Sequence, residues 1–442
     1  MNRSFYIGVL GSKTQMKGID VCSNNIANIN NYGFKADRPE FKTIFETEAS
    51  DNFFDPTSND ISAGAVLQTT VSDLSPGSYM QTDKDFDMAI AGEGWFGVMN
   101  KDKVYFTRSG SFFKDAQGYL VDDDGNYLMG TMAANFTDNT DTISPIDGEI
   151  KLKDVANQEK IQLPTMLKMQ AKPTTFVEIK GNLDPTIKKR FDPNLQKDVE
   201  VPNIEKYSTD IVAPNGEKNI LNITFEKIVP QKQSGVDWKA TFELADSEGR
   251  ILDSSEGFLS FNEYGALIEA NIPTLNNGSS PLKIDLGTVY SPENPNGGYD
   301  GIVSHVGASQ QKSISKDGYV AGDLTGYDVL ENGEIIAAFD NGKTAPIAKV
   351  AIYHFQNDQG LHKVTPTIYE TTPNSGEPKF YKDANGNVIE ESKILSKTLE
   401  TSNVQLSEAL TRLIVMQKAF DANAKSITTS DQMIQKAINM KK

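Results

Sequence analysis

An apolar side chain recurs at every seventh position from residue 399 to residue 434 of this 442-residue chain. Such a series forms a seam about one side chain wide, which is typical of helices that pack lengthwise against other helices. A shorter series with the same spacing, interrupted by Ser12 and Ser23, occupies the other end of the chain. We therefore predict a helix at each end and an assembly interface with these members: Phe5, Val9, Met16, Ile19, Ile26, Leu399, Leu406, Leu413, Phe420, Ile427 and Ile434.

The alternative for both helices is ordinary packing on the core of their own domain. The positions around the C-terminal seam carry small polar residues as often as charged ones, for example Thr411, Gln417 and Asn423. Small polar side chains suit a surface that meets other protein subunits. We therefore favour assembly of the chain with copies of itself.

The charge of the chain is distributed unevenly. Its net charge is −17, which argues against nucleic-acid binding, because phosphate contacts need a basic surface. Residues 1–35 contain four basic and one acidic residue, and residues 399–442 contain six basic and four acidic residues, so the acidic excess lies between them. This pattern suits a subunit whose ends are buried in an assembly and whose middle faces water.

The N-terminal apolar stretch is short. Residues 5–10 are apolar, but Lys13 and Lys17 follow before the length that a signal-peptide core or a membrane-spanning helix requires. We expect no membrane insertion and no cleaved signal peptide. The single cysteine, Cys22, cannot form an internal disulfide, so stability must come from packing and hydrogen bonds.

From about residue 60 to residue 390 the helical period gives way to short β-like runs separated by turn residues. Within this region, the connections between residues 150 and 310 are rich in Pro and Asn, which suggests an inserted domain. The predicted fold class is multidomain and mainly antiparallel β, with N- and C-terminal α-helices that pack as a coiled-coil-like assembly domain. The predicted domains are nested and discontinuous: residues 1–35 with 396–442 (helical assembly domain), 36–72 (linker and β segment), 73–149 with 311–395 (β domain) and 150–310 (inserted outer β domain).

Residues 92–97, GEGWFG, match the G-x-G-x-x-G fingerprint of dinucleotide-binding proteins. That fingerprint requires a following helix, whereas VMNKDKVYF at residues 98–106 has the pattern of a β-hairpin. The three histidines, His305, His354 and His362, do not have the spacing of metal ligands. We therefore assign no catalytic residue, no cofactor and no metal ligand, and expect that the protein is not an enzyme.

The strongest local pattern is NNIANINNYGFK at residues 24–35. It has the character of a helix end, because Asn side chains make local hydrogen bonds and Gly33 can take the left-handed conformation. Five Asn residues in eight positions exceed what one helix cap requires. These residues closely resemble the N-terminal signature of the bacterial flagellar axial proteins, the family of rod, hook and hook-associated subunits. The matching positions are Asn24, Asn25, Asn28, Asn30, Gly33, Phe34 and Lys35, with Asn31 where the family usually has Thr.

Other segments resemble the same family. LETSNVQL at residues 399–406 and AFDANAKSITT at 419–429 look like its C-terminal motif. FDMAIAGEGWF at 86–96 and FTRSGSF at 106–112 are similar to its characteristic β segment, with Trp95 and Phe106 in place of the usual Phe and Tyr. A last group looks specifically like the hook-type members: KDGYVAGDLTG at 316–326, FDNGK at 339–343 and FQNDQGL at 355–361.

The resemblance implies a structural subunit of the flagellar hook, located in the hook and basal body outside the cell. Such a subunit polymerises beneath a hook cap into a tubular, flexible universal joint between rod and filament. The implied partners are copies of the chain, the rod and hook-filament junction proteins, the hook cap and the flagellar type III export apparatus. The alternative within the family is a rod-hook junction or hook-associated paralogue. From other classes, an NAD-dependent enzyme is suggested only by residues 92–97, and a secreted adhesin is a third alternative.

FKTIF at residues 41–45 resembles the export-gate motif of this family, two large apolar residues four positions apart. Phe41 and Phe45 are therefore candidate export residues. The alternative is a strand or helix edge that follows the N-terminal helix.

Overall fold

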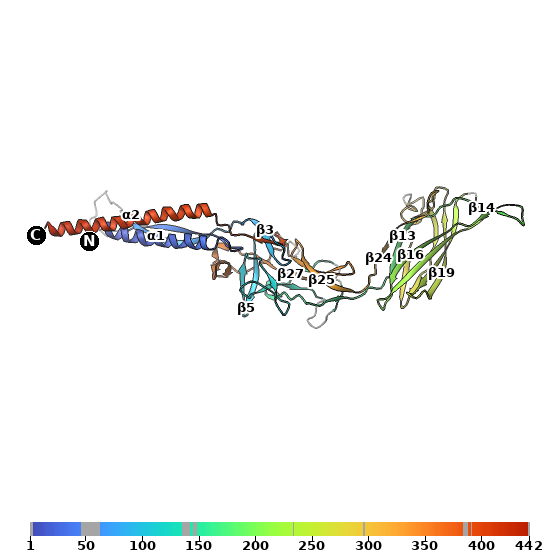
Figure 1. Cartoon of the computed structure of the whole chain (residues 1–442), viewed down its shortest axis with the longest axis horizontal. Helices are drawn as coiled ribbons and strands as arrows, with labels where there is room; N and C mark the ends of the chain where they lie inside the picture. Colours follow the sequence, from blue (N-terminus) through green and yellow to red (C-terminus); the bar gives the residue numbers. More distant parts are fainter. Residues whose placement is uncertain are drawn as a thin grey trace.

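The computed structural model of the protein describes residues 3–45, 62–134, 142–144, 148–232, 234–294, 297–382, 388–389 and 391–440. The molecule is elongated (Figure 1). Two helices and both chain ends lie at one end, an inner β region lies in the middle, and an outer β region lies at the other end. The prediction of a mainly β chain with N- and C-terminal helices is confirmed.

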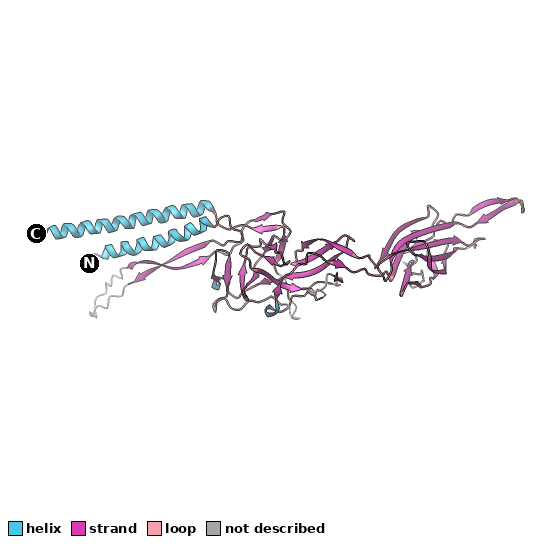
Figure 2. Ribbon diagram, turned by 60° about the horizontal axis from the view of Figure 1, so that its bottom comes forward, coloured by secondary structure: helices cyan, strands magenta, loops and turns pink. Residues whose placement is uncertain are grey.

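The two helices, α1 (Arg3–Ala27) and α2 (Leu406–Asn439), run antiparallel to each other. An antiparallel hairpin formed by β1 (Asp37–Phe45) and β2 (Ser62–Ser72) extends beside them (Figure 2). The Thr14 hydroxyl on α1 donates a hydrogen bond to the backbone oxygen of Ala65 in β2, at 2.6 Å. One side of α1 therefore contacts α2 and another side contacts the hairpin.

The inner β region combines strands from both halves of the chain. Fourteen strands of the described residues form one sheet, whose longest path interleaves early and late strands. The strands of the region are β3 (Tyr79–Gln81), β4 (Met88–Ala91), β5 (Trp95–Asn100), β6 (Lys103–Thr107), β7 (Phe113–Lys114), β8 (Leu120–Val121), β9 (Tyr127–Met132), β10 (Thr142–Ile143), β11 (Glu159–Lys160), β12 (Lys168–Met169), β25 (Gly322–Val329), β26 (Glu334–Phe339), β27 (Thr344–Val350), β28 (Ile352–Tyr353), β29 (His362–Lys363), β30 (Ile368–Glu370), β31 (Lys393–Ser396) and β32 (Thr398–Glu400). The order β25-β26-β27-β9-β5-β6 joins segments far apart in sequence into one body.

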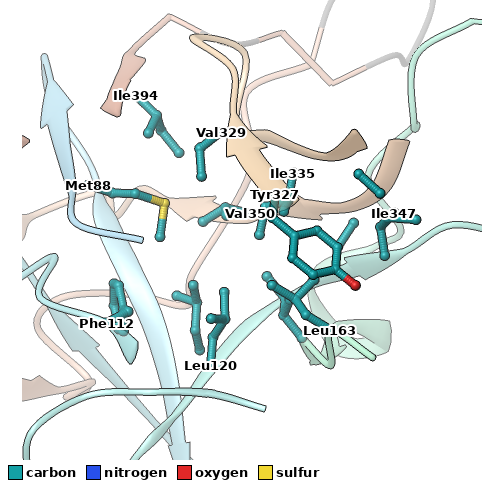
Figure 3. Packing of buried hydrophobic residues seen from close by; sticks show 14 of the residues in the cluster. Met88, Phe112, Leu120, Leu163, Tyr327, Val329, Ile335, Ile347, Val350 and Ile394 are labelled. Atoms are coloured by element: carbon teal, nitrogen blue, oxygen red, sulfur yellow. The ribbon is translucent and has the colours of Figure 1, made fainter. Parts of the chain in front are cut away.

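Two clusters of buried side chains fill the inner β region. The first is largely aliphatic and includes Met88, Leu120, Ile335 and Ile347, with Tyr327 among them (Figure 3). The second is mainly aromatic, with the members Trp95, Phe106, Tyr353, Phe355, Tyr369 and Phe380. Burial of large apolar side chains from both halves of the chain is the main favourable contribution to folding of this region.

The outer β region is formed by one continuous part of the chain. Its strands are β13 (Phe176–Asn182), β14 (Lys188–Asp192), β15 (Lys197–Val201), β16 (Ile204–Val212), β17 (Lys218–Lys227), β18 (Val236–Ala245), β19 (Ile251–Phe261), β20 (Leu267–Asn271), β21 (Leu275–Asn277), β22 (Ser280–Asp285), β23 (Ile302–Val303) and β24 (Gln310–Lys316). Strands β16 to β20 form an antiparallel meander, in which alternate residues such as Leu221, Ile223 and Phe225 are buried. They pack with Val177 and Ile284 from the second sheet of this region into a third core cluster.

The core clusters do not divide the chain at residue 150. Ile161, Leu163 and Met169 belong to the first inner cluster, and the outer cluster begins at Val177. The two connecting segments meet at an antiparallel bridge between Lys172 and Tyr319, with hydrogen bonds of 2.9 and 3.0 Å. We therefore propose that the outer domain extends from residue 174 to residue 317.

Removal of residues 174–317, with Pro173→Asn, should leave a folded inner β region. The bridged residues Lys172 and Tyr319 would then be joined by Asn and Gly318, a sequence that favours a two-residue hairpin turn. Circular dichroism and thermal melting of the purified protein measure the outcome. We expect β structure with one cooperative transition.

The matched control is removal of residues 150–310. This deletion takes Ile161, Leu163 and Met169 out of the first inner cluster, where all three are fully buried. Loss of several core side chains costs about 2–5 kcal/mol for each, so this variant should not fold. Equal folding of the two deletion proteins would contradict the proposed boundary.

The buried histidine of the inner region makes folding sensitive to acid. Burial, with the nearby charges of Arg108 and Lys379, lowers the pKa of His354 to about 4. Between pH 6.5 and 4 the unfolded chain protonates this group and the folded chain does not, so the free energy of unfolding falls as the pH falls. The loss attributable to His354 should reach about 3 kcal/mol at pH 4.

Urea unfolding of the parent protein and of a His354→Asn variant, at several pH values in this window, measures that loss. Carboxylates titrate in both proteins, so the difference between their pH slopes isolates the histidine. We expect the variant to lose less stability on acidification. Parallel slopes would show that His354 does not couple folding to pH.

Candidate assembly site

The contact between α1 and α2 is close because α1 presents small residues. The Ser4 and Ser430 hydroxyl oxygens lie 3.0 Å apart, at one end of the contact. A Cβ atom on Gly8 would lie 2.9 Å from Ile427, and one on Gly18 would lie 2.8 Å from the Met416 sulfur. Gly11 meets the Asn423 side chain in the same way, so Ser4, Gly8, Gly11, Gly18 and Cys22 form a line of small residues along α1.

The predicted heptad seam of α2 lies partly in this contact. Leu413, Phe420 and Ile427 are half-buried, while Ala409 and Ser430 are fully buried at half-heptad positions. Ile434 continues the same face but is exposed, one turn beyond the contact of Ser430 with Ser4. Leu406, the first residue of the helix, is also exposed.

Leu399 is not part of the helical seam, contrary to the prediction. It lies in β32, where it is buried and paired with Met80 of β3. The helix cannot extend back to it because the Asn403 side chain accepts a hydrogen bond from the Ala36 backbone and donates to the Asp73 backbone oxygen. These two long-range hydrogen bonds hold Asn403 in the non-helical segment that precedes α2.

The closest approach of α1 to α2 is made by its line of small residues rather than by the predicted apolar series. Phe5, Ile19 and Ile26 are half-buried, whereas Val9 and Met16 are exposed. The prediction was made from large apolar side chains, but the face that approaches α2 is the line of small residues. The helix pair therefore leaves Val9 and Met16 uncovered on α1.

A buried group of charges lies at the base of the helix pair. Lys35 Nζ lies 2.5 Å from Glu400 Oε1, and both side chains are only 1% exposed. Arg108 Nη1 lies 3.6 Å from Glu400 Oε2, and its Nη2 donates to the Gly92 backbone oxygen at 2.9 Å. One carboxylate from the C-terminal segment therefore faces a cation from the N-terminal segment and another from the inner β region. We call these three residues the charge junction.

Burial governs the electrostatics of the charge junction. It lowers the pKa of the Lys35 ammonium, and the Glu400 carboxylate beside it acts in the opposite direction. Burial also lowers the pKa of the Arg108 guanidinium, again opposed by Glu400. Because charged groups are costly to bury without a counter-charge, both cations depend on Glu400.

The remaining residues of the Asn-rich motif hold the chain around this junction. Asn25 pairs with the Asp37 backbone through two hydrogen bonds, of 2.7 and 2.9 Å, and so ties the end of α1 to the start of β1. Asn28 is buried and donates to the backbone oxygen of Asn24 at 2.8 Å. Asn30 is exposed.

Gly33 and Phe34 complete the turn into the junction. Gly33 has φ of +68°, and a Cβ atom there would lie 2.3 Å from the Ser109 nitrogen, so only glycine fits. Its backbone nitrogen donates to the Glu400 backbone oxygen at 2.8 Å. Phe34 is fully buried, with the Lys363 ammonium 4.2 Å from its ring centre.

Sequence reasoning missed the charges that complete this site. Glu400 and Arg108 lie inside the segments at residues 399–406 and 106–112, but the contact of Glu400 with Lys35 joins positions 365 residues apart. The signal that could have found them is the presence of one acid and two bases within three otherwise uncharged motif segments. The line of small residues on α1 was also missed, although Gly8, Gly11 and Gly18 are unusual inside a helix.

The other candidate features have simple structural roles. Residues 92–97 turn from β4 into β5, and no helix follows them. Phe41 lies on β1 with its ring beside Gly18, and the side chain of Phe45 lies outside the described residues.

In the described residues, no group of three His, Cys, Asp or Glu side chains is placed to hold a metal ion. Neither described helix is long and apolar enough to cross a membrane.

Two family profiles match segments of the chain that contribute to this site. The family profile described as Flagellar hook protein FlgE/F/G D1 domain matches residues 89–177. The profile described as Flagellar basal body rod FlgEFG protein C-terminal matches residues 395–440. The first contains Arg108, and the second contains Glu400 and all of α2.

Relatives match over the whole chain. The flagellar hook protein of Borreliella burgdorferi is 29% identical over 100% of both chains. That of Salmonella typhimurium is 26% identical over 99% of this chain and 100% of its own. A crystal structure of a flagellar hook protein from Helicobacter pylori shares the fold, with a TM-score of 0.52 over 73% of this chain and 100% of that chain, at 18% identity.

The fold and these matches define the class, and the chain belongs to the family of bacterial flagellar rod and hook proteins. Within this family it belongs with the flagellar hook proteins, because the relatives that match it from end to end are hook proteins. The family is structural, and its place is the flagellar hook and basal body.

Loss of Glu400 should destabilise the protein more than loss of Lys35. Glu400→Gln leaves Lys35 and Arg108 buried without their shared counter-charge, whereas Lys35→Met leaves the Arg108–Glu400 pair in place. Breaking a buried ion pair by removing one partner costs about 3–5 kcal/mol, and we expect Glu400→Gln to lie at or above the upper end. Urea unfolding of the monomeric proteins gives the order. A larger loss in Lys35→Met would contradict the shared role of Glu400.

Proposed function

We propose that this chain is the structural subunit of a flagellar hook and that it polymerises through the outer surface of its helix pair. The observation that carries the proposal is the apolar surface that one subunit leaves uncovered there. Leu410, Ile414 and Val415 on α2 are exposed, as are Val9 and Met16 on α1. Exposed apolar surface of this extent on a paired helix is a feature of protein contact sites.

Helix α2 has two apolar surfaces, one that serves folding of the subunit and one that is available for assembly. Leu413, Phe420 and Ile427 are half-buried within the subunit, and Ile427 meets Gly8 of α1, while Leu410 and Ile414 are exposed. In the proposed polymer, neighbouring copies cover this second surface and the helix pairs line a tube. The predicted coiled-coil-like packing belongs to these contacts between subunits.

Membership of the hook family supports a proposal for the place of the tube in the flagellum and for its partner proteins. The tube forms a flexible joint between rod and filament, grows beneath a hook cap and contacts the rod and hook-filament junction proteins. Subunits reach it through the flagellar type III export apparatus, with Phe41 and Phe45 as the candidate export residues. A rod-hook junction protein is the alternative function, and loss of hooks with intact basal bodies in a deletion strain would favour the hook subunit.

Ile414→Asp should prevent polymerisation without unfolding the monomer. Ile414 is 56% exposed in the single subunit, so the carboxylate is hydrated there, but its burial in a polymer would cost on the order of several kcal/mol. Sedimentation and electron microscopy measure polymer, and thermal melting measures the monomer. The control is Ile414→Ala, which removes most of the same side chain but adds no charge. Tubes of normal yield from Ile414→Asp would contradict the proposal.

A further inference from the structure

The outer region carries a two-stranded arm that the core does not explain. Strands β14 and β15 pair only with each other and project from the end of the molecule farthest from the helices (Figure 1). The arm also exposes the large apolar side chains of Phe191 and Leu195 near its tip. A two-stranded hairpin without further packing is at most marginally stable in water, so a partner is expected to support it.

The two faces of the arm differ in charge. Residues opposite each other in the ladder share a face, which places Lys188, Arg190 and Lys197 together with Val199 and Val201. The only acid on that face is Asp192. The other face carries Lys189 opposite Glu200, and Phe191 opposite Asp198. The first face is therefore basic and partly aliphatic, in a chain whose net charge is −17.

Two of the three basic residues of the arm have an acid near them: Lys188 helps to lower the pKa of Asp184, and Lys197 stands opposite Asp192 in the ladder. Among the described residues, none of Lys188, Arg190 and Lys197 forms an ion pair. All three are exposed.

A complementary surface lies on the β16–β19 face of the same region. Because Leu221, Ile223 and Phe225 point into the core, the alternate residues of β17 and their ladder partners point outward. This outward surface carries five acids against the three lysines Lys206, Lys218 and Lys239, and the acids are Asp210, Glu226, Asp237, Glu243 and Glu256. Ile220 and Ile251, which share a row of the ladder through Ala245, are exposed at its end.

We propose that the basic face of the β14–β15 arm docks on the acidic β16–β19 face of a second copy of this chain. Within one subunit the arm projects away from that face, so the two surfaces are complementary between copies (Figure 1). A contact between two different surfaces of the same chain is heterologous, and a heterologous contact that does not close into a ring generates a helical polymer. This inference rests on the proposed function, since it describes a second contact in the same polymer, formed by the outer regions.

Site-specific photocrosslinking tests the contact directly. Full-length protein with Arg190 replaced by p-benzoylphenylalanine is mixed with ¹⁵N-labelled parent protein, assembled into tubes and irradiated, and crosslinked peptides are identified by mass spectrometry. We expect crosslinks from labelled strands β16–β19 of another copy. The matched control places the same group at position 189, on the opposite face of the arm, where these crosslinks should be lost. Tubes whose position-190 crosslinks lie elsewhere, or are absent, would overturn the inference while leaving the proposed function intact.

Charge reversal provides an independent readout. Lys188→Glu with Arg190→Glu should lower the temperature at which assembled tubes dissociate, whereas Lys189→Glu should not. Adding Glu226→Lys and Glu243→Lys to the doubly reversed chain should restore that temperature, because the charges are complementary again. Failure of the parent chain to form tubes under any condition would contradict the proposed function and, with it, this inference. Normal dissociation of the doubly reversed tubes would contradict the inference alone.

Discussion

The contact of Glu400 with Lys35 and Arg108 is the constraint on which the arrangement of the whole chain depends. It joins the segment after α1, the segment before α2 and the inner β region at one buried point. The positions of buried charged groups are closely restricted, because each group must keep its counter-charge nearby to offset the loss of hydration. The two ends of the chain therefore leave the inner region at a defined place and in a defined direction. Asn25, Gly33 and Asn403 strengthen this by hydrogen bonds between the same segments.

The geometry of the helix pair follows from this fixed base. The line of small residues on α1 allows α2 to approach until Ser4 and Ser430 are in hydrogen-bonding contact. Glycine inside a helix costs about 1 kcal/mol relative to alanine, but at Gly8, Gly11 and Gly18 it leaves the space that this close approach needs. Close packing on one side of α2 leaves Leu410 and Ile414 exposed on another. A subunit can then be folded before assembly and still present apolar surface to its neighbours.

The sequence was most informative about features that depend on residues close together in the chain. Helical periodicity is local, so the heptad spacing correctly indicated a helix at the C-terminal end. It predicted Leu413, Phe420 and Ile427 as part of an interface between subunits, whereas all three are half-buried within the single subunit. It failed at Leu399, since the strand pairing with Met80 depends on a segment far away in the chain. On α1 the closest contact with α2 is made by glycines, which a search for apolar residues passes over, while the predicted Val9 and Met16 are exposed. The charge junction could not be found from any one segment, because each of its residues comes from a different one.

The central claim is that the helix pair keeps its antiparallel packing in the polymer and uses the outer face of α2 for contact between subunits. A helical reconstruction by electron cryomicroscopy of tubes grown from this chain tests it most directly. The account predicts that Gly8, Gly11 and Gly18 still face α2 of the same subunit, with Leu410 and Ile414 buried against a neighbour and the Lys35–Glu400 contact intact. Tubes in which Leu410 and Ile414 face solvent, or in which α1 and α2 of one subunit have separated, would contradict it.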